Sequence, residues 1–238
     1  VYRDATSRNA RLVEGARPVG GLGRKAEEGL VTAMDSAKNP RLVAALGYAK
    51  RGWAVFPAWE GKKVPATRHG FKNATTDKAT IVRWWTRHPA ANVAIATGAI
   101  SGLVVLHVDP RSGGDESLAE HERAHGSLAT TLRAKTGGGG QHIFFQLPEH
   151  VVVKSGKLAP GLDVKADGGY VIASPSTHPS GGTYAWTSNP NRTPLVECPP
   201  SVGPAPRPPT KTRAAEVGAD AAETVLGALF KELGLLGR

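Results

Sequence analysis

Two side chains able to bind a metal follow a run of apolar residues near the middle of the chain. Residues 103–110 read LVVLHVDP, and the four leading apolar residues are typical of a fully buried strand. His107 and Asp109 are two positions apart, so on an extended strand their side chains point to the same face. A Pro-Arg-Ser-Gly-Gly turn follows directly. Polar side chains at the end of a core strand, beside a glycine turn, are typical of an α/β active site.

A second carboxylate, Asp163, lies between apolar residues in the stretch GLDVKADGGY. A buried carboxylate is costly unless it is paired or holds a metal. Carboxylates from two segments suit Mg²⁺, which takes one or two of them together with substrate phosphates. A purely structural arrangement stays open, in which Asp109 caps the turn at Pro110 and Asp163 pairs with a lysine or arginine. Lys165 shares the face of Asp163, either as a plain ion pair or as a phosphate contact.

A glycine run, TGGGGQH, covers residues 136–142. Glycines let a backbone approach a ligand closely, and their N–H groups can face a phosphate. The run is not a P-loop, since no Gly-Lys-Ser/Thr follows it. A glycine-rich hairpin turn explains it equally well. His142 opens the next strand, where it either donates to a triphosphate or is simply satisfied within the fold.

The formal net charge is +10, which favours nucleic acid or another polyanion as partner, although ordinary basic enzymes exist. Residues 41–87 alone hold ten Lys and Arg against two acidic residues. We expect a polar loop there to line a track for a nucleic-acid backbone, or for a triphosphate, through Lys62, Lys63, Arg68 and Lys72. Tryptophans are interleaved with these residues, either to stack on single-stranded bases or to pack in the core; they are Trp53, Trp59, Trp84 and Trp85.

Composition excludes several other classes of protein. The single cysteine, Cys198, excludes an internal disulfide and a cysteine-rich zinc site. No apolar run is long enough for a membrane span, and a cytoplasmic protein is expected.

Patterning predicts a mixed α/β fold in four parts. They are an N-terminal extension over 1–38 with a helix at 25–38, a main domain over 39–198, a proline-rich linker over 199–213, and a C-terminal helical segment over 214–238. Within 39–198 helices are predicted from Pro40 to Gly52, from Thr76 or Asp77 to Arg87, and over 115–126. Strands are predicted at 53–57, 91–98, 103–110, 132–135, 142–148 and 181–187, with a hairpin-like connection at 151–157 and two paired strands around Gly168-Gly169.

The motifs VDPRSGGDESL, TGGGGQHIFF and GLDVKADGGYVIASPS, in this order, resemble the bifunctional DNA primase–polymerase (prim-pol) domain of the archaeo-eukaryotic primase superfamily, found in phage and plasmid replication proteins. The upstream GWAVFPAWEGKKVPAT is similar to the N-terminal half of that domain, so the likeness spans roughly residues 42–186. The resemblance implies an α/β (α+β) core with one half related to the RNA-recognition fold. It also implies primer synthesis and extension on a single-stranded DNA template from NTPs or dNTPs, often beside a helicase domain on the same chain or in trans.

The resemblance also implies roles for single residues. The paired acids of the family's first motif fall on His107 and Asp109, the histidine of the second on His142, and the acid of the third on Asp163. In the family the acids hold Mg²⁺ or Mn²⁺, and the histidine contacts the phosphates of the incoming nucleotide. The implied nucleotide-binding set is His142, Lys165, Gly139, Gly140, Gln141 and Arg111.

One position departs from the family, because His107 stands where the first acid is usual. A neutral imidazole is a poor ligand for Mg²⁺ and an acceptable one for Mn²⁺, so weaker metal binding and impaired catalysis are expected. Three explanations stay open: a natural variant that prefers Mn²⁺, an inactivated domain kept for binding, and an introduced substitution. The alternative function is a catalytically silent single-stranded-DNA or origin-binding module. A metal-dependent nuclease would use similar carboxylates but leaves the glycine run and His142 unexplained.

Overall fold

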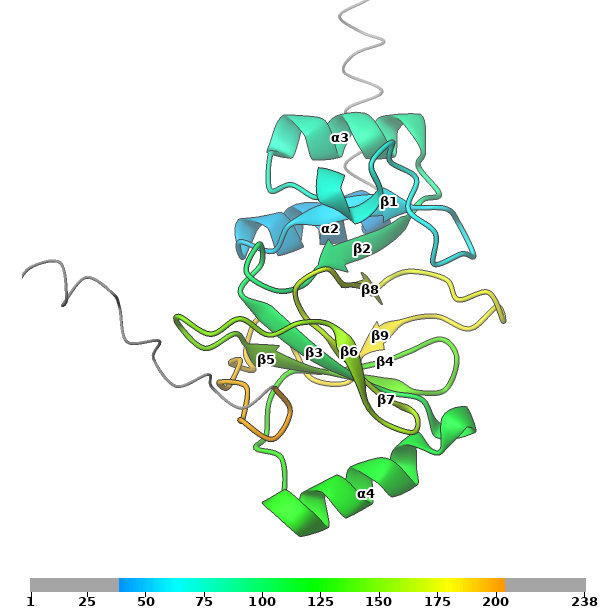
Figure 1. The fold of residues 1–238 in the computed structure, drawn as a ribbon. Coiled ribbons are helices and arrows are strands. Elements are labelled where there is room, and N and C mark those ends of the chain that lie inside the picture. Colours follow the sequence, from blue (N-terminus) through cyan, green and yellow to red (C-terminus); the bar gives the residue numbers. More distant parts are fainter. Residues whose placement is uncertain (1–38, 204–238) are drawn as a thin grey trace, which may run out of the picture.

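The computed structural model describes residues 39–203, which fold as two antiparallel sheets with helices on their outer sides (Figure 1). The predicted helices over 25–38 and 214–236 and most of the proline-rich linker lie outside the described residues. The expected mixed α/β fold class is confirmed. No helix within 39–203 has the length and apolar character needed to cross a membrane.

The smaller sheet has three strands in the order β1-β2-β8, namely Val55–Ala58, Asn92–Ala96 and Tyr170–Ala173. Two helices, α2 (Pro40–Lys50) and α3 (Lys78–Arg87), pack beside it, and a short 3-10 helix, η1 (Gly70–Asn73), precedes α3. Both helices begin where polar caps predict. The Asn39 side chain accepts hydrogen bonds from the backbone of Arg41 and Leu42, and the Asp77 carboxylate accepts one from Thr80.

The larger sheet has six strands in the order β6-β7-β3-β5-β4-β9. These strands cover Gly156–Ala159, Leu162–Lys165, Leu103–Val108, Gln141–Gln146, Arg133–Lys135 and Ala185–Trp186. The 3-10 helix η2 (Pro110–Ser112) follows β3 and leads into α4 (Gly114–His125). Figure 1 shows α4 on the side of this sheet away from α2 and α3.

Strand β3 is buried on both faces, which explains its continuous apolar sequence. Val105 packs with Phe144 and Trp53 in the cluster that also takes in α2 and α3. On the opposite face, Leu106 packs with Phe145 in a second cluster. His107 is the one polar residue of β3, and it lies on the same face as Val105, toward the smaller sheet.

The predicted pairing of two strands around Gly168-Gly169 is wrong. The turn exists, because the amide of Gly169 donates to the carbonyl of Ala166. However, β7 pairs with β3 and β6 in the larger sheet, whereas β8 pairs with β2 in the smaller one. A glycine signal predicts a change of direction but not the partner, which is chosen by distant strands. The turn therefore carries the chain from one sheet to the other.

Candidate functional site

Three of the predicted site residues lie side by side on neighbouring strands. His107 in β3 is the register partner of Asp163 in β7 on one side and of His142 in β5 on the other. Directly opposed residues of antiparallel strands present their side chains to the same face. Strand pairing therefore brings these three motifs together although they are far apart in the sequence. The row formed by Asp163, His107 and His142 faces the smaller sheet.

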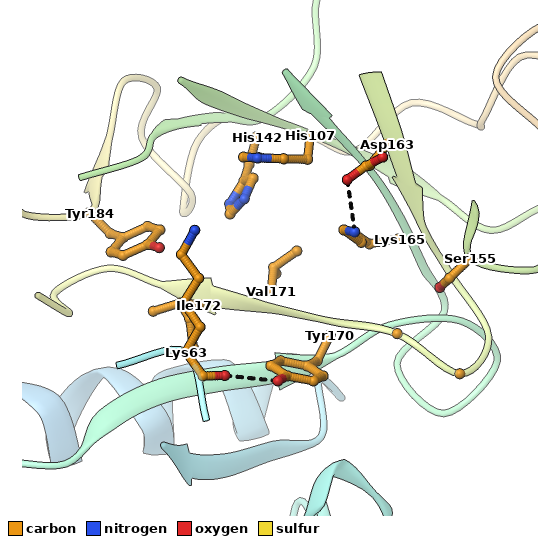
Figure 2. A pocket seen from close by; sticks show the side chains of 12 residues that line it. Lys63, His107, His142, Ser155, Asp163, Lys165, Tyr170, Val171, Ile172 and Tyr184 are labelled. Atoms are coloured by element: carbon orange, nitrogen blue, oxygen red, sulfur yellow. Dashed lines mark hydrogen bonds and ion pairs between the residues drawn. The ribbon is translucent and has the colours of Figure 1, made fainter. Parts of the chain in front are cut away.

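A pocket of about 420 Å³ opens over this row, between the larger sheet and β8 (Figure 2). Lys63 enters it from the loop after β1, and its ammonium group lies near His142 and Tyr184. On the opposite side of the pocket from Lys63, Lys165 Nζ lies 3.2 Å from Asp163 Oδ2. The full lining is Lys63, His107, His142, Ser155, Asp163, Lys165, Gly168, Gly169, Tyr170, Val171, Ile172 and Tyr184.

Asp109 follows β3 with extended backbone (φ −112°, ψ 101°), so the alternation that relates it to His107 continues. Its carboxylate accepts the backbone N–H of Arg111 and pairs with that guanidinium at 3.2 Å. The hydrogen bond from Arg111 lowers the pKa of Asp109. Asp109 is not among the residues that line the pocket.

Both structural alternatives for the carboxylates are thus seen: Asp109 caps η2, and Asp163 pairs with Lys165. Neither ion pair is deeply buried, and such pairs contribute only about 0–1 kcal/mol to stability. Exchanging the cation for a ligand therefore costs little, and both carboxylates remain available for binding.

The two imidazoles each have an unused polar atom. His107 Nδ1 and His142 Nδ1 are buried and have no hydrogen-bond partner among the described residues. The ring centroids are 5.0 Å apart. Burial lowers the pKa of both groups, most strongly for His142, and the charge of Lys63 adds to the effect. Both rings are therefore neutral at pH 7, and an unpartnered nitrogen in each suits a ligand.

These shifts predict acid-sensitive stability. In the folded protein the pKa of His142 is well below its ordinary value of 6.5, so below pH 6.5 the unfolded chain binds a proton that the folded protein does not. The free energy of unfolding is therefore highest above pH 6.5 and falls as the pH drops below it. Replacing His142 by phenylalanine should flatten the pH dependence by up to about 1.4 kcal/mol per pH unit. Urea unfolding between pH 7.5 and 5.5 measures this, and parallel profiles for the two proteins would contradict it.

The glycine run makes a tight turn against the end of β3. Gly139 has a left-handed backbone (φ 90°), and a Cβ on Gly140 would overlap the carbonyl of Val108. The amides of Gly139 and Gly140 both donate to Thr136. The turn therefore packs closely against Val108 at Gly140 and is open at Gly139, and the N–H groups of both glycines already have acceptors.

Other predicted nucleotide-binding residues lie apart from the row. Gln141 bonds to Arg133, and it points to the face opposite that of His142 because neighbours in a strand alternate. Arg111 forms its ion pair with Asp109 and does not line the pocket. Lys62, Arg68 and Lys72 are exposed on the segment between β1 and α3, outside the pocket.

Sequence reasoning missed the wall opposite the histidines. Tyr170 and its neighbours in β8 line it, with Tyr184 from the segment before β9. The Tyr170 hydroxyl donates to the carbonyl of Lys63 at 2.8 Å, and burial raises the pKa of Tyr184 to about 12. Apolar strand residues and isolated tyrosines carry no motif, so no local signal identified this wall.

The residues around the row combine carboxylates with cations. Within residues 39–203 no three His, Cys, Asp or Glu side chains are grouped to hold an ion. The site nevertheless presents hard carboxylate oxygens and three cations, Lys63, Lys165 and Arg111. Three cations against two carboxylates favour a polyanionic ligand.

Comparison with protein families gives a match over most of the domain. Residues 45–201 match the family model described as bifunctional DNA primase/polymerase, N-terminal (Prim-Pol). The match covers most of the described residues, including β3, the glycine turn and β7. No curated protein matches the chain.

Proposed function

The chain belongs to the bifunctional DNA primase/polymerase family, and from this premise we propose that it catalyses template-directed nucleotidyl transfer on single-stranded DNA. The supporting observation is the row of Asp163, His107 and His142 on three adjacent strands, facing one cation-lined pocket. Membership implies primase and polymerase function for the family and a general use of divalent metals. The residue roles below belong to the proposal.

We assign the metal-binding role to Asp109 and Asp163, with His107 in the position between them. Imidazole is a better ligand for Mn²⁺ than for Mg²⁺, so Mn²⁺ is the preferred ion. When bound, the ion supplies charge neutralisation at the phosphates and lowers the pKa of the primer hydroxyl, so that no side-chain base is required.

The triphosphate is held by the cations of the pocket. Lys165 and Lys63 lie on opposite sides of it, and Arg111 pairs with Asp109 just beyond the end of β3. His142 contributes its unpartnered Nδ1. The negative charge of the phosphates replaces the present carboxylate partners of Lys165 and Arg111.

The exposed cations Lys62, Arg68 and Lys72 hold the template backbone, because they lie on the same segment that delivers Lys63 to the pocket. A helicase, on the same natural chain or in trans, is the expected partner that exposes single strands. Such a role places the protein in the cytoplasm of a bacterium or phage-infected cell.

Primer extension tests the proposal. A primed single-stranded template with dNTPs or NTPs and either Mn²⁺ or Mg²⁺ should give template-length products, with more synthesis in Mn²⁺. A second assay without primer tests primer synthesis. Absence of product with both metals and both nucleotide types would contradict the proposal, provided that the protein binds the template.

The second candidate function is a catalytically silent module that binds single-stranded DNA. It is favoured by His107, which stands where the family usually has an acid, and by the ion pairs that Asp109 and Asp163 make with neighbouring cations. It predicts salt-dependent DNA binding that needs no metal and is unaffected by Asp109→Ala.

A further inference from the structure

Trp59 differs from the other tryptophans near the N-terminal end of the domain. Trp53 and Trp85 are buried, and Trp84 is partly buried against the core. Trp59 follows directly after β1 and remains 46% exposed. Leaving a large aromatic side chain half in water forgoes a substantial part of its burial energy. A stacking partner from outside the fold would recover that energy.

The turn that carries Trp59 is held in place at several points. Its ends are joined by the hydrogen bond from Trp59 N to Val64 O, at 2.9 Å. The carbonyl of Lys62 accepts from the buried Asn92 side chain at 3.1 Å. The carbonyl of Lys63 accepts from the Tyr170 hydroxyl at 2.8 Å. The exposed ring is therefore presented by a rigid support, which reduces the entropy lost on binding.

The same turn connects the exposed ring to the pocket. Lys63, four residues after Trp59, lines the pocket, whereas Lys62 is exposed on the outside. The acidic residue of the turn, Glu60, is paired with Arg41 at 3.4 Å, so its negative charge is offset. An aromatic ring beside lysines is the combination with which proteins bind single strands: bases stack, and cations follow the backbone.

We propose that Trp59 stacks on a base of single-stranded DNA whose backbone follows Lys62 toward the pocket. The inference rests on the proposed function, and it adds the point at which an unpaired base is held just outside the active site. A single strand is favoured over a duplex because stacking on a side chain requires an unstacked base face. The positive charge of the turn favours DNA over a protein partner.

The proposal is tested by measuring the affinity of the protein for a labelled thymidine oligonucleotide by fluorescence anisotropy at fixed salt. An oligonucleotide of equal length with abasic sites is measured in parallel. Trp59→Ala should weaken binding of the ordinary strand roughly 5- to 100-fold, the range that stacking of one base supplies. The abasic strand should bind the wild type and Trp59→Ala equally. Trp59→Phe should retain most of the affinity. Ile100→Ala, an exposed apolar residue beyond the opposite end of β2, is the matched control and should bind as wild type.

Two results would overturn the proposal. Unchanged affinity of Trp59→Ala for the ordinary strand would show that the exposed ring holds no base. An equal loss on ordinary and abasic strands would show a general effect without stacking. Both results are independent of synthesis by the wild type, so a failed primer extension and a failed stacking test remain separate findings.

Discussion

His107→Asp is expected to raise primer extension with Mg²⁺ about tenfold or more, equivalent to about 1.4 kcal/mol of transition-state stabilisation. The substitution adds a carboxylate opposite Asp163 and two residues before Asp109. Three carboxylates bind a hard cation better than two carboxylates and a neutral imidazole. The Mn²⁺ preference of the wild type should become smaller in the variant, because the added ligand favours Mg²⁺ more. Product formation in parallel titrations of the two metals is the measurement.

A second readout does not depend on activity. Without metal, the new carboxylate lies next to Asp163, and the repulsion between like charges should lower the melting temperature. Added Mg²⁺ should restore stability in His107→Asp more than in the wild type. In EDTA the variant should bind nucleoside triphosphate more weakly than the wild type, because the excess of cations in the pocket is gone.

His107→Asn is the matched control, since it has the size of aspartate without the charge. It should show neither the gain in synthesis nor the metal-dependent rise in melting temperature. If neither His107→Asp nor the wild type synthesises DNA while both bind it, the silent binding module is the better account.

Asp163→Asn is expected to reduce synthesis at least about 100-fold, comparable to the loss of a group that stabilises transition-state charge. The amide keeps the shape of the side chain but removes the charge that holds a cation in the pocket. Template binding should change little, because Lys62, Arg68 and Lys72 lie outside the pocket. Steady-state extension rates and anisotropy on the same preparations separate the two effects.

Asp167→Asn tests whether any nearby carboxylate matters equally. Asp167 is four residues after Asp163, but its Oδ1 accepts the backbone N–H of Ala99 at 2.7 Å, away from the pocket. Asparagine keeps that acceptor, so Asp167→Asn should fold and synthesise as wild type. Equal losses in Asp163→Asn and Asp167→Asn would contradict a specific role for Asp163.

The site illustrates what local pattern can identify. Residue type and motif order singled out His107, Asp109, His142 and Asp163. Strand pairing brings His107, His142 and Asp163 into one row, whereas Asp109 does not line the pocket. Lys165 also reaches the pocket, as its two-residue spacing from Asp163 suggests. Gln141, which was expected to bind nucleotide, does not face the pocket. Side chains alternate along β5, so Gln141 points to the face opposite His142 and bonds to Arg133. The roles of all these residues in catalysis remain predictions.

The sequence by itself determined the helices, most strands and the family. Apolar spacing and polar caps act within a few residues, so α2 and α3 begin close to the predicted positions, directly after Asn39 and Asp77. Only the tertiary structure decided that β7 and β8 belong to different sheets, and that β8 and Tyr184 form the second wall of the pocket. It also decided which tryptophan stays exposed. These outcomes depend on pairing and packing between segments that lie tens of residues apart in the sequence. Which strands pair is decided by long-range contacts, and a local sequence pattern carries no information about them.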